Sequence, residues 1–329
     1  MIDNLFASGE GNINNPYKIT CERHLNNIRY AGSLYIDESG EHTYLQKHFI
    51  ISSNISLVNN WEPINITMKS GSIVGIEEGI IISGLKIEEI KGNQNIGFIR
   101  NVHGGTISNI CFSNVDIKVI NSIENTLISV GVVAGSATGA TIENCTILSG
   151  NISIGTADDS IDLIGARYTF TGGICGMGQY VYDCNNNCQI FSHGDIGGIC
   201  CYILGGIIDN CNNYGNLILF HNNQLLLSDI ENKSLGGIIG IAYGVEILNC
   251  ENEGDLRYES KGYVNDVNLA PRIGWLAGRI RNSSTEEGII VNRGVAYEKI
   301  YTTNLQSVSY GCAVHNQDQY TKLNIGKIE

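Results

Sequence analysis

The chain repeats itself, and this repetition limits the folds available to it more than any other feature of the sequence. "IGGICCYILGGIIDNCNNYGNL" and "LGGIIGIAYGVEILNCENEGDL" have the same length and place glycine pairs, an Asn-Cys step and a closing Gly-x-Leu at matching positions. These copies begin at Ile196 and Leu235, related copies begin at Ile96, Val130 and Thr171, and a shorter one begins at Ile273. A unit of roughly twenty to twenty-five residues is too short to bury a core alone, so successive units must stack as in a solenoid.

The pattern inside each copy indicates strands. Apolar residues occur in short groups such as Ile207-Ile208 and Ile247-Leu248, and glycine or asparagine separates these groups. No segment past residue 40 keeps the helical i, i+3, i+4 spacing for three turns. Short strands with Gly and Asn at the corners, where left-handed backbone is needed, predict an all-β fold, a right-handed parallel β-helix.

One bend of each coil is predicted to carry two ladders of like residues, stacked at the ~4.8 Å spacing of neighbouring strands. The first is a hydrogen-bonded ladder of Asn144, Asp183, Asn210 and Asn249, and the second is a ladder of Cys145, Cys184, Cys211 and Cys250. Cys111 lies as far from the first glycine of its copy as Cys145 does and is expected at the same position. Eleven cysteines, an odd number in a long chain with much apolar material, predict buried free thiols rather than disulfides.

The ends of the solenoid are expected to be capped. Cys21 to Tyr30 is predicted to be a short capping helix, with Thr20 as its N-cap and Leu25 and Ile28 facing the core. We therefore divide the chain into an N-terminal cap with the first coil (1–60), the repeats (61–295) and a C-terminal cap or tail (296–329). Two inserts, 153–170 and 217–234, interrupt the repeats.

Composition excludes several classes of function. The formal net charge is -13, and no run of Lys or Arg interrupts the acidic excess, so nucleic acid is not an expected partner. No stretch has the ~20 apolar residues that span a bilayer, and no signal peptide is visible at the N-terminus. No His or Cys spacing typical of a metal site occurs, nor a phosphate loop or a GxSxG motif, so we expect no metal and no cofactor.

The repeats resemble the GLUG motif, the glycine-rich "GGIVG…I.NC.N.G.V" unit of bacterial surface and secreted proteins. The N-terminal "GEGNINNPYKITCERHLNNI" is similar to the "GxGTxxxPYxIxTxxxLxxI" segment that precedes such repeats, and "HFIISSNISLVNNWEPI" is similar to the segment that follows it. Asn54 and Ser56 depart from the family pattern, which has acids there. The resemblance implies an adhesive or carbohydrate-associated role at a cell surface or on an extracellular particle, without a defined catalytic centre.

Two groups of acidic residues are candidate ligand-binding sites. Asp158, Asp159 and Asp162 lie in the first insert, where they could bind a cation or act as an acid and base, or could simply be solvated. Glu251, Glu253 and Asp255 alternate along one copy, and the equivalent residues of the preceding copy are Asn212, Tyr214 and Asn216. Alternate residues of a strand share a face, so acids, amides and Tyr214 would form one stripe on the coil wall.

These observations predict a non-enzymatic binding or structural module that engages a polysaccharide or a protein partner through its lateral strand face and inserts, within a larger assembly. No residue is assigned a catalytic role. One alternative is a polysaccharide lyase or glycoside hydrolase on the β-helix wall, which requires the acids to converge with a basic or tyrosyl group. A second alternative is an architectural rod inside a cell.

Overall fold

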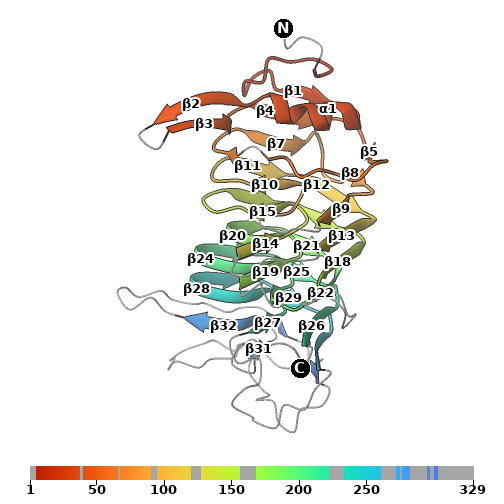
Figure 1. Ribbon diagram of the computed structural model, residues 1–329, viewed down its shortest axis with the longest axis vertical. Coiled ribbons are helices and arrows are strands. Elements are labelled where there is room, and N and C mark those ends of the chain that lie inside the picture. Colours follow the sequence, from red (N-terminus) through yellow and green to blue (C-terminus); the bar gives the residue numbers. More distant parts are fainter. Residues whose placement is uncertain are drawn as a thin grey trace.

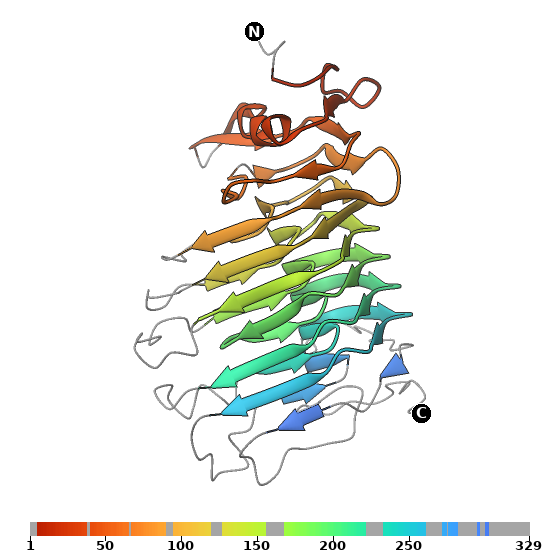
Figure 2. The ribbon, with the colours of Figure 1, turned by 90° about the vertical axis from the view of Figure 1, so that its right-hand side faces the viewer.

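The computed structural model describes residues 5–37, 40–65, 67–89, 95–119, 127–155, 168–221, 233–260, 272–274, 276–281, 295–296 and 300–302. These residues form a parallel β-helix, in which successive coils stack along one axis from the N-terminal cap onward (Figure 1). The predicted fold is therefore confirmed. Figure 2 shows strands of successive coils lying parallel, one above another.

Four parallel sheets make up the wall. Sheet 1 runs in the order β1 (Tyr17–Ile19), β4 (His48–Ile51), β7 (Ser72–Gly75), β11 (Thr106–Ser108), β16 (Thr141–Glu143), β20 (Cys175–Tyr182), β24 (Cys200–Asp209), β28 (Ile239–Leu248) and β32 (Ala277–Arg281). Its two further strands are β10 (Ile99–Asn101) and β15 (Ala134–Ser136), which pair with each other, and β15 also pairs with β20.

Sheet 2 consists of short strands: β5 (Ile55–Ser56), β8 (Ile80–Ser83), β12 (Ile110–Ser113), β17 (Thr146–Ile147), β21 (Asn185–Asn186), β25 (Asn212–Asn213), β29 (Glu251–Asn252) and β33 (Val295–Ala296). Sheet 3 consists of β9 (Lys86–Glu89), β13 (Val115–Val119), β18 (Gly150–Ile154), β22 (Gln189–Ser192), β26 (Leu217–His221), β30 (Leu256–Ser260) and β34 (Ile300–Thr302).

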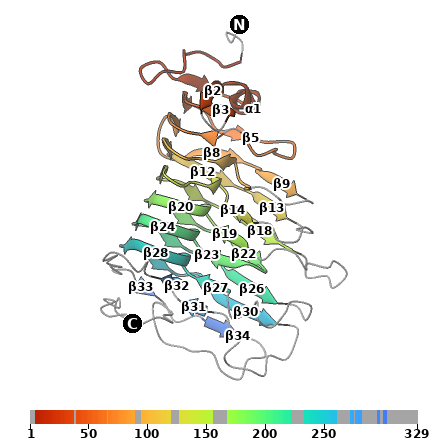
Figure 3. The ribbon, with the colours of Figure 1, turned by 60° about the vertical axis from the view of Figure 1, so that its left-hand side comes forward.

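Sheet 4 consists of β14 (Leu127–Val130), β19 (Tyr168–Gly172), β23 (Asp195–Gly197), β27 (Ser234–Gly236) and β31 (Arg272–Gly274). A full coil passes through sheets 4, 1, 2 and 3 in that order, and Figure 3 shows sheet 4 between sheets 1 and 3. Both inserts leave sheet 3 and return at sheet 4, and their central residues, 156–167 and 222–232, lie outside the described residues.

The N-terminal end carries the expected helix. Helix α1 (Glu22–Asn27) continues into a 3-10 turn, Ile28–Tyr30, and both Leu25 and Ile28 are fully buried. The N-cap residue is Cys21 rather than Thr20, and no side chain caps the helix; the Thr20 hydroxyl instead lies 3.2 Å from Nδ1 of His24. Beside the helix, β2 (Ser33–Asp37) and β3 (Gly40–Leu45) form an antiparallel hairpin, which β6 (Thr67–Met68) extends.

At the other end, the coil pattern extends past residue 295. Strand β33 continues sheet 2, and β34 continues sheet 3 from within the segment predicted to be a tail. The remainder of the predicted tail, apart from Ala296 and β34, lies outside the described residues.

The bend between sheets 1 and 2 is left-handed in five successive coils, from the coil of Asn109 to that of Asn249. Asn109, Asn144, Asp183, Asn210 and Asn249 have φ values of 60°, 48°, 52°, 51° and 49°. Asn and Asp tolerate this region better than other residues with a side chain. The amide of Asn144 donates to Asn109 Oδ1 at 2.9 Å, and the amide of Asn210 donates to Asp183. The amide of Asn249 donates to Asp209 Oδ1 at 2.8 Å instead. Of the four residues of the expected ladder, only Asp183 and Asn210 are therefore joined by a side-chain hydrogen bond.

The residues after this bend form the cysteine ladder. Cys145, Cys184, Cys211 and Cys250 are fully buried, and each thiol donates to the carbonyl oxygen two residues earlier, at 3.1–3.4 Å. All ten cysteines among the described residues are free. Burial raises the pKa of the Cys211 thiol well above its ordinary value and that of nearby Cys188 to about 12, so both are unreactive thiols at neutral pH.

Cys111 does not belong to this ladder. It pairs in register with Thr146, and Ile110 occupies the position above Cys145. Between Ile96 and Ile99 the chain has one residue fewer than between their register partners Val130 and Ala134. Because the spacing from glycine to cysteine is the same in both copies, Cys111 lies one residue beyond the register partner of Cys145. At this position its side chain is only partly buried.

A second asparagine ladder lies inside the coils. Asn186, Asn213 and Asn252 are register partners with at most 1 % exposure. The amide of Asn186 donates to Asn213 Oδ1 at 2.8 Å, and the amide of Asn213 donates to Asn252 Oδ1 at 2.7 Å and to the carbonyl of Gly215 at 2.9 Å. Polar groups can be buried at low cost only when they are paired in this way.

The second glycine of the repeat's glycine pair faces this buried ladder. A Cβ added at Gly173 would collide with the side chain of Asn186, and one added at Gly198 would lie 2.5 Å from Cγ of Asn213. Two coils before Gly173 and Asn186, the same space is filled by Phe98 and Phe112. Their rings meet edge to face with centroids 5.6 Å apart. The glycine pair and the Asn two residues after cysteine are therefore two halves of one packing arrangement.

We expect the middle rung of the buried ladder to be important for stability. Asn213→Ala removes one partner of the Asn186 amide, which keeps its bond to the carbonyl of Cys188, and leaves Oδ1 of Asn252 and the carbonyl of Gly215 unpaired in the interior. This change should lower the free energy of unfolding by about 3 kcal/mol. Asn212→Ala removes the neighbouring, half-buried amide and should cost less than about 1 kcal/mol. Urea denaturation followed by circular dichroism measures both, and equal losses would contradict an important role for the ladder.

Two glycines are constrained for different reasons: Gly198 by close contacts and Gly205 by its backbone conformation. Gly198→Ala should lower the free energy of unfolding by more than about 3 kcal/mol, because the new Cβ meets the carbonyl of Gly237 and the side chain of Asn213. Gly205 has φ +66°, with nothing within 4 Å of an added Cβ. Gly205→Ala should therefore cost only the backbone penalty of about 1–2 kcal/mol. Thermal melts of the two variants should show this order, and the reverse order would refute it.

Candidate functional site on the lateral face

The strands of sheet 2 position the candidate residues. In β21, β25 and β29 the second residue belongs to the buried ladder, so the first residue points outward. Asn185, Asn212 and Glu251 therefore form an outward column along the axis, and the amide of Asn212 donates to Asn185 Oδ1 at 3.1 Å. The buried ladder fixes the register of this outer column.

A second column follows in the turn after these strands. Asn187, Tyr214 and Glu253 are exposed, and the backbone N–H groups of Tyr214 and Glu253 donate to Asn186 and Asn213 of the preceding coils. Tyr214 is 43 % exposed. We call the outward surface formed by these residues the amide–acid face; it comprises Asn185, Asn187, Gln189, Asn212, Tyr214, Asn216, Glu251, Glu253 and Asp255.

The phenol of Tyr214 lies in the field of two carboxylates. Partial burial raises the pKa of Tyr214 above its ordinary value, and the negative charges of Glu253 and Glu251 raise it further. The hydroxyl therefore stays protonated at neutral pH and can both donate and accept hydrogen bonds. The structure thus brings three of the predicted ligand-binding residues together.

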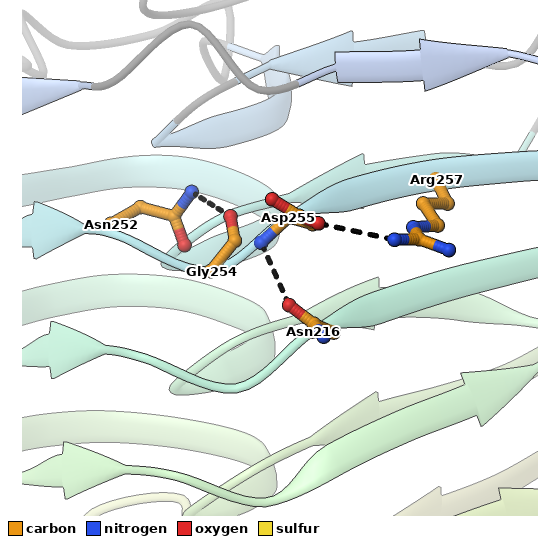
Figure 4. Close-up of polar contacts among 5 residues, drawn as sticks. All are labelled: Asn216, Asn252, Gly254, Asp255 and Arg257. Atoms are coloured by element: carbon orange, nitrogen blue, oxygen red, sulfur yellow. Dashed lines mark hydrogen bonds and ion pairs between the residues drawn. The ribbon is translucent and has the colours of Figure 1, made fainter.

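Asp255, the remaining predicted ligand-binding residue on this face, has a different environment (Figure 4). Its carboxylate binds Nη2 of Arg257 at 3.2 Å, and its backbone N–H donates to Oδ1 of Asn216 in the preceding coil at 3.1 Å. Asn252 Nδ2 donates to the carbonyl of Gly254 in the same turn at 3.0 Å. Asp255 therefore fixes the turn and balances the charge of Arg257, and it is less available to a ligand than Glu251 or Glu253.

Basic side chains are absent from four successive coil segments on this side of the solenoid, and the sequence of the next coil, around β33, contains Arg293 and Lys299 outside the described residues. Segments 141–151, 178–189, 205–216 and 244–255 contain no Lys, Arg or His. They do contain acids, including Glu143 and Asp209, which lie directly before the bend. Partial burial raises the pKa of Tyr182, and the negative charges of Asp209 and Glu143 raise it further. This part of the wall is therefore rich in amides, tyrosine and negative charge.

The other acidic candidates, Asp158, Asp159 and Asp162, lie outside the described residues. Within the described part of the chain, no group of three or more His, Cys, Asp or Glu side chains could hold a metal ion. The same residues include no helix with the length and apolar character needed to cross a bilayer.

Asp195 is the buried acidic residue among the described residues, and the sequence pattern does not indicate it. Asp195 at the start of β23 is only 4 % exposed, and Oδ1 accepts the backbone N–H of Ser234 at 2.7 Å. Burial raises the pKa of its carboxyl, while Lys233 and Arg279 act in the opposite direction. These partners lie in later coils, so sequence spacing gives no sign of them. Asp195 links neighbouring coils in the wall and lies away from the amide–acid face, on sheet 4.

Comparison with known proteins gives the fold and little more. No known protein family matches the chain, and no curated protein matches its sequence. A solved structure with a similar fold is that of "a putative immunoglobulin A1 protease from Bacteroides ovatus". The two chains share 15 % identity with a TM-score of 0.57, over 94 % of this chain and 83 % of the other. At this identity, the similarity supports a shared fold alone.

We expect neutralising the two carboxylates to lower the pKa of Tyr214. Replacing Glu251 and Glu253 with glutamine removes the negative charges that disfavour phenolate, while partial burial still holds the pKa above its ordinary value. Titration of ¹³Cζ-labelled tyrosine by NMR measures the shift, and Tyr214→Phe assigns the signal. The matched variant Glu77→Gln/Glu78→Gln, at an exposed turn several coils away, should leave this pKa unchanged. An unchanged value in the first variant would show that the carboxylates do not act on the phenol.

Proposed function

We propose that this protein is a non-catalytic carbohydrate-binding module, built as a β-helix of the GLUG type, which binds a glycan on the amide–acid face. The observation that carries the proposal is the exposed, protonated phenol of Tyr214, which lies close to Glu251 and Glu253 and beside a column of amides. Carboxylates and amides can accept or donate pairs of hydrogen bonds to sugar hydroxyls, and an aromatic ring offers an apolar surface to the sugar ring.

The fixed positions of these groups support binding without rearrangement. The outer columns lie on, or directly after, strands whose inner residues are almost fully buried and hydrogen-bonded from coil to coil. A ligand would then meet side chains that are already held in register, which lowers the entropy cost of association. The GLUG resemblance adds the expectation of a location at a cell surface or on an extracellular particle.

The electrostatics favour binding over catalysis at this face. A tyrosyl base in a lyase needs a phenolate, whereas Glu251 and Glu253 disfavour that state in Tyr214. Asp255, the acid with a nearby cation, is paired with Arg257. These contacts suit a surface that holds hydroxyl groups better than one that removes a proton from a sugar.

Tyr214→Ala tests the proposal. The full-length protein is passed over a panel of immobilised bacterial and host polysaccharides, and both retention and the release of reducing ends or unsaturated products are recorded. We expect retention without products, and a loss of retention of about tenfold or more in the variant, which corresponds to about 1.4 kcal/mol. The control is Tyr30→Ala, which removes a tyrosine that is 70 % exposed near the N-terminal cap.

Three results would contradict the proposal. Product release would indicate an enzyme, and equal retention of the Tyr214→Ala and unmodified proteins would place the site elsewhere. Absence of retention on every polysaccharide would favour a protein partner or an architectural role. Circular dichroism of both variants establishes that a loss of retention does not reflect unfolding.

A further inference from the structure

The amide–acid face is periodic along the solenoid axis. Asn185, Asn212 and Glu251 are neighbours in the ladder of sheet 2. Asn187, Tyr214 and Glu253 follow one residue beyond the buried ladder in the same three coils. Gln189, Asn216 and Asp255 precede the register partners Ile190, Leu217 and Leu256 of sheet 3. Each of the three columns therefore presents one polar side chain per coil, about every 4.8 Å.

This periodicity matches a polymer better than a single sugar. In an extended β-1,4-linked glycan, consecutive sugar rings follow one another at a distance close to the rise of one coil. Such a chain, lying parallel to the solenoid axis, would bring one sugar to each coil and repeat similar hydrogen bonds along the columns. A monosaccharide could use the groups of only one or two coils.

The charges narrow the ligand class further. Four successive coil segments on this side, 141–151, 178–189, 205–216 and 244–255, contribute acids and no basic residue. The cation of Arg257, on the neighbouring strand β30, is bound to Asp255. A uronate or sulfate group placed over Glu251 or Glu253 would therefore meet negative charge without a compensating partner among the described residues of these coils. Uncharged hydroxyls meet no such repulsion, and an amine-bearing sugar would be attracted.

We propose that the ligand is an extended β-linked glycan without anionic groups, which lies parallel to the solenoid axis across at least three coils. This inference rests on the proposed function and specifies its ligand. Tyr214 would contact the middle of the bound segment, with Asn185 and Asn187 on one side along the axis and Glu251 and Glu253 on the other.

Calorimetric titration of the full chain with three series of β-1,4-linked oligosaccharides, one to six units long, tests the inference. The glucose series is neutral, the glucosamine series is cationic and the mannuronate series is anionic. Affinity for the glucose series should rise by about tenfold or more between one and three units, as further coils become engaged. The glucosamine series should bind at least as well, with an affinity that falls as salt rises, and the mannuronate series should bind more weakly.

A variant with two carboxylates neutralised separates the contribution of charge to ligand selectivity from the contribution of shape. Glu251→Gln/Glu253→Gln should narrow the difference between mannuronate and glucose oligomers, because the glutamine amides keep hydrogen-bonding groups in place without the repulsion. Glu77→Gln/Glu78→Gln removes the same number of charges away from the face and should leave the difference unchanged.

The outcomes distinguish this inference from the function on which it rests. Binding that depends on Tyr214 but not on oligosaccharide length would overturn the axial arrangement and leave a glycan-binding module. Mannuronate binding equal to or tighter than glucose binding would overturn the charge selectivity in the same way. If no series binds and no polysaccharide retains the protein, both proposals fail together.

Discussion

The in-register pairing of each coil with the next is the constraint on which the rest of this structure depends. A strand of two residues such as β25 has too few contacts to hold its own position. Its register is set by Asn213, whose buried amide must find partners in the coils on either side. Because side chains alternate along a strand, fixing the inner residue also fixes Asn212 outside. The surface columns are therefore a by-product of hydrogen bonding inside the coil.

The interior changes character along the axis under the same constraint. One column contains Phe112, Ile147, Asn186, Asn213 and Asn252 as successive register partners. Apolar residues fill the earlier coils, where Phe98 packs against Phe112, and amides replace them where glycine leaves room. Dense packing tolerates neither a void nor a collision, so the two sides of the coil must change together.

The sequence was sufficient to predict the solenoid, because every copy of the repeat has the same pattern of strands and turns and must stack on its neighbours. It was also sufficient to group Tyr214 with Glu251 and Glu253, since equivalent positions of successive copies must lie on one face. It did not place Asn186, Asn213 and Asn252 inside, because asparagine is usually exposed and only the glycines opposite reveal the space. Cys111 was misplaced because an extra residue between Val130 and Ala134 is hidden by equal glycine-to-cysteine spacing. The pairing of Asp255 with Arg257 depends on side-chain conformations that spacing does not specify.

The buried amides also give the stack a direction. Asn213 accepts a hydrogen bond from Asn186 and donates one to Asn252, so every inner rung has the same acceptor side and donor side. A duplicate of the coil that contains Asn213 could be inserted between these neighbours and would satisfy both. The same coil could not be inserted between Phe112 and Ile147, where neither neighbour carries a side-chain amide. Growth of such a protein by duplication would therefore be confined to its amide-lined coils, and new copies there would lengthen the outer columns by one polar group each.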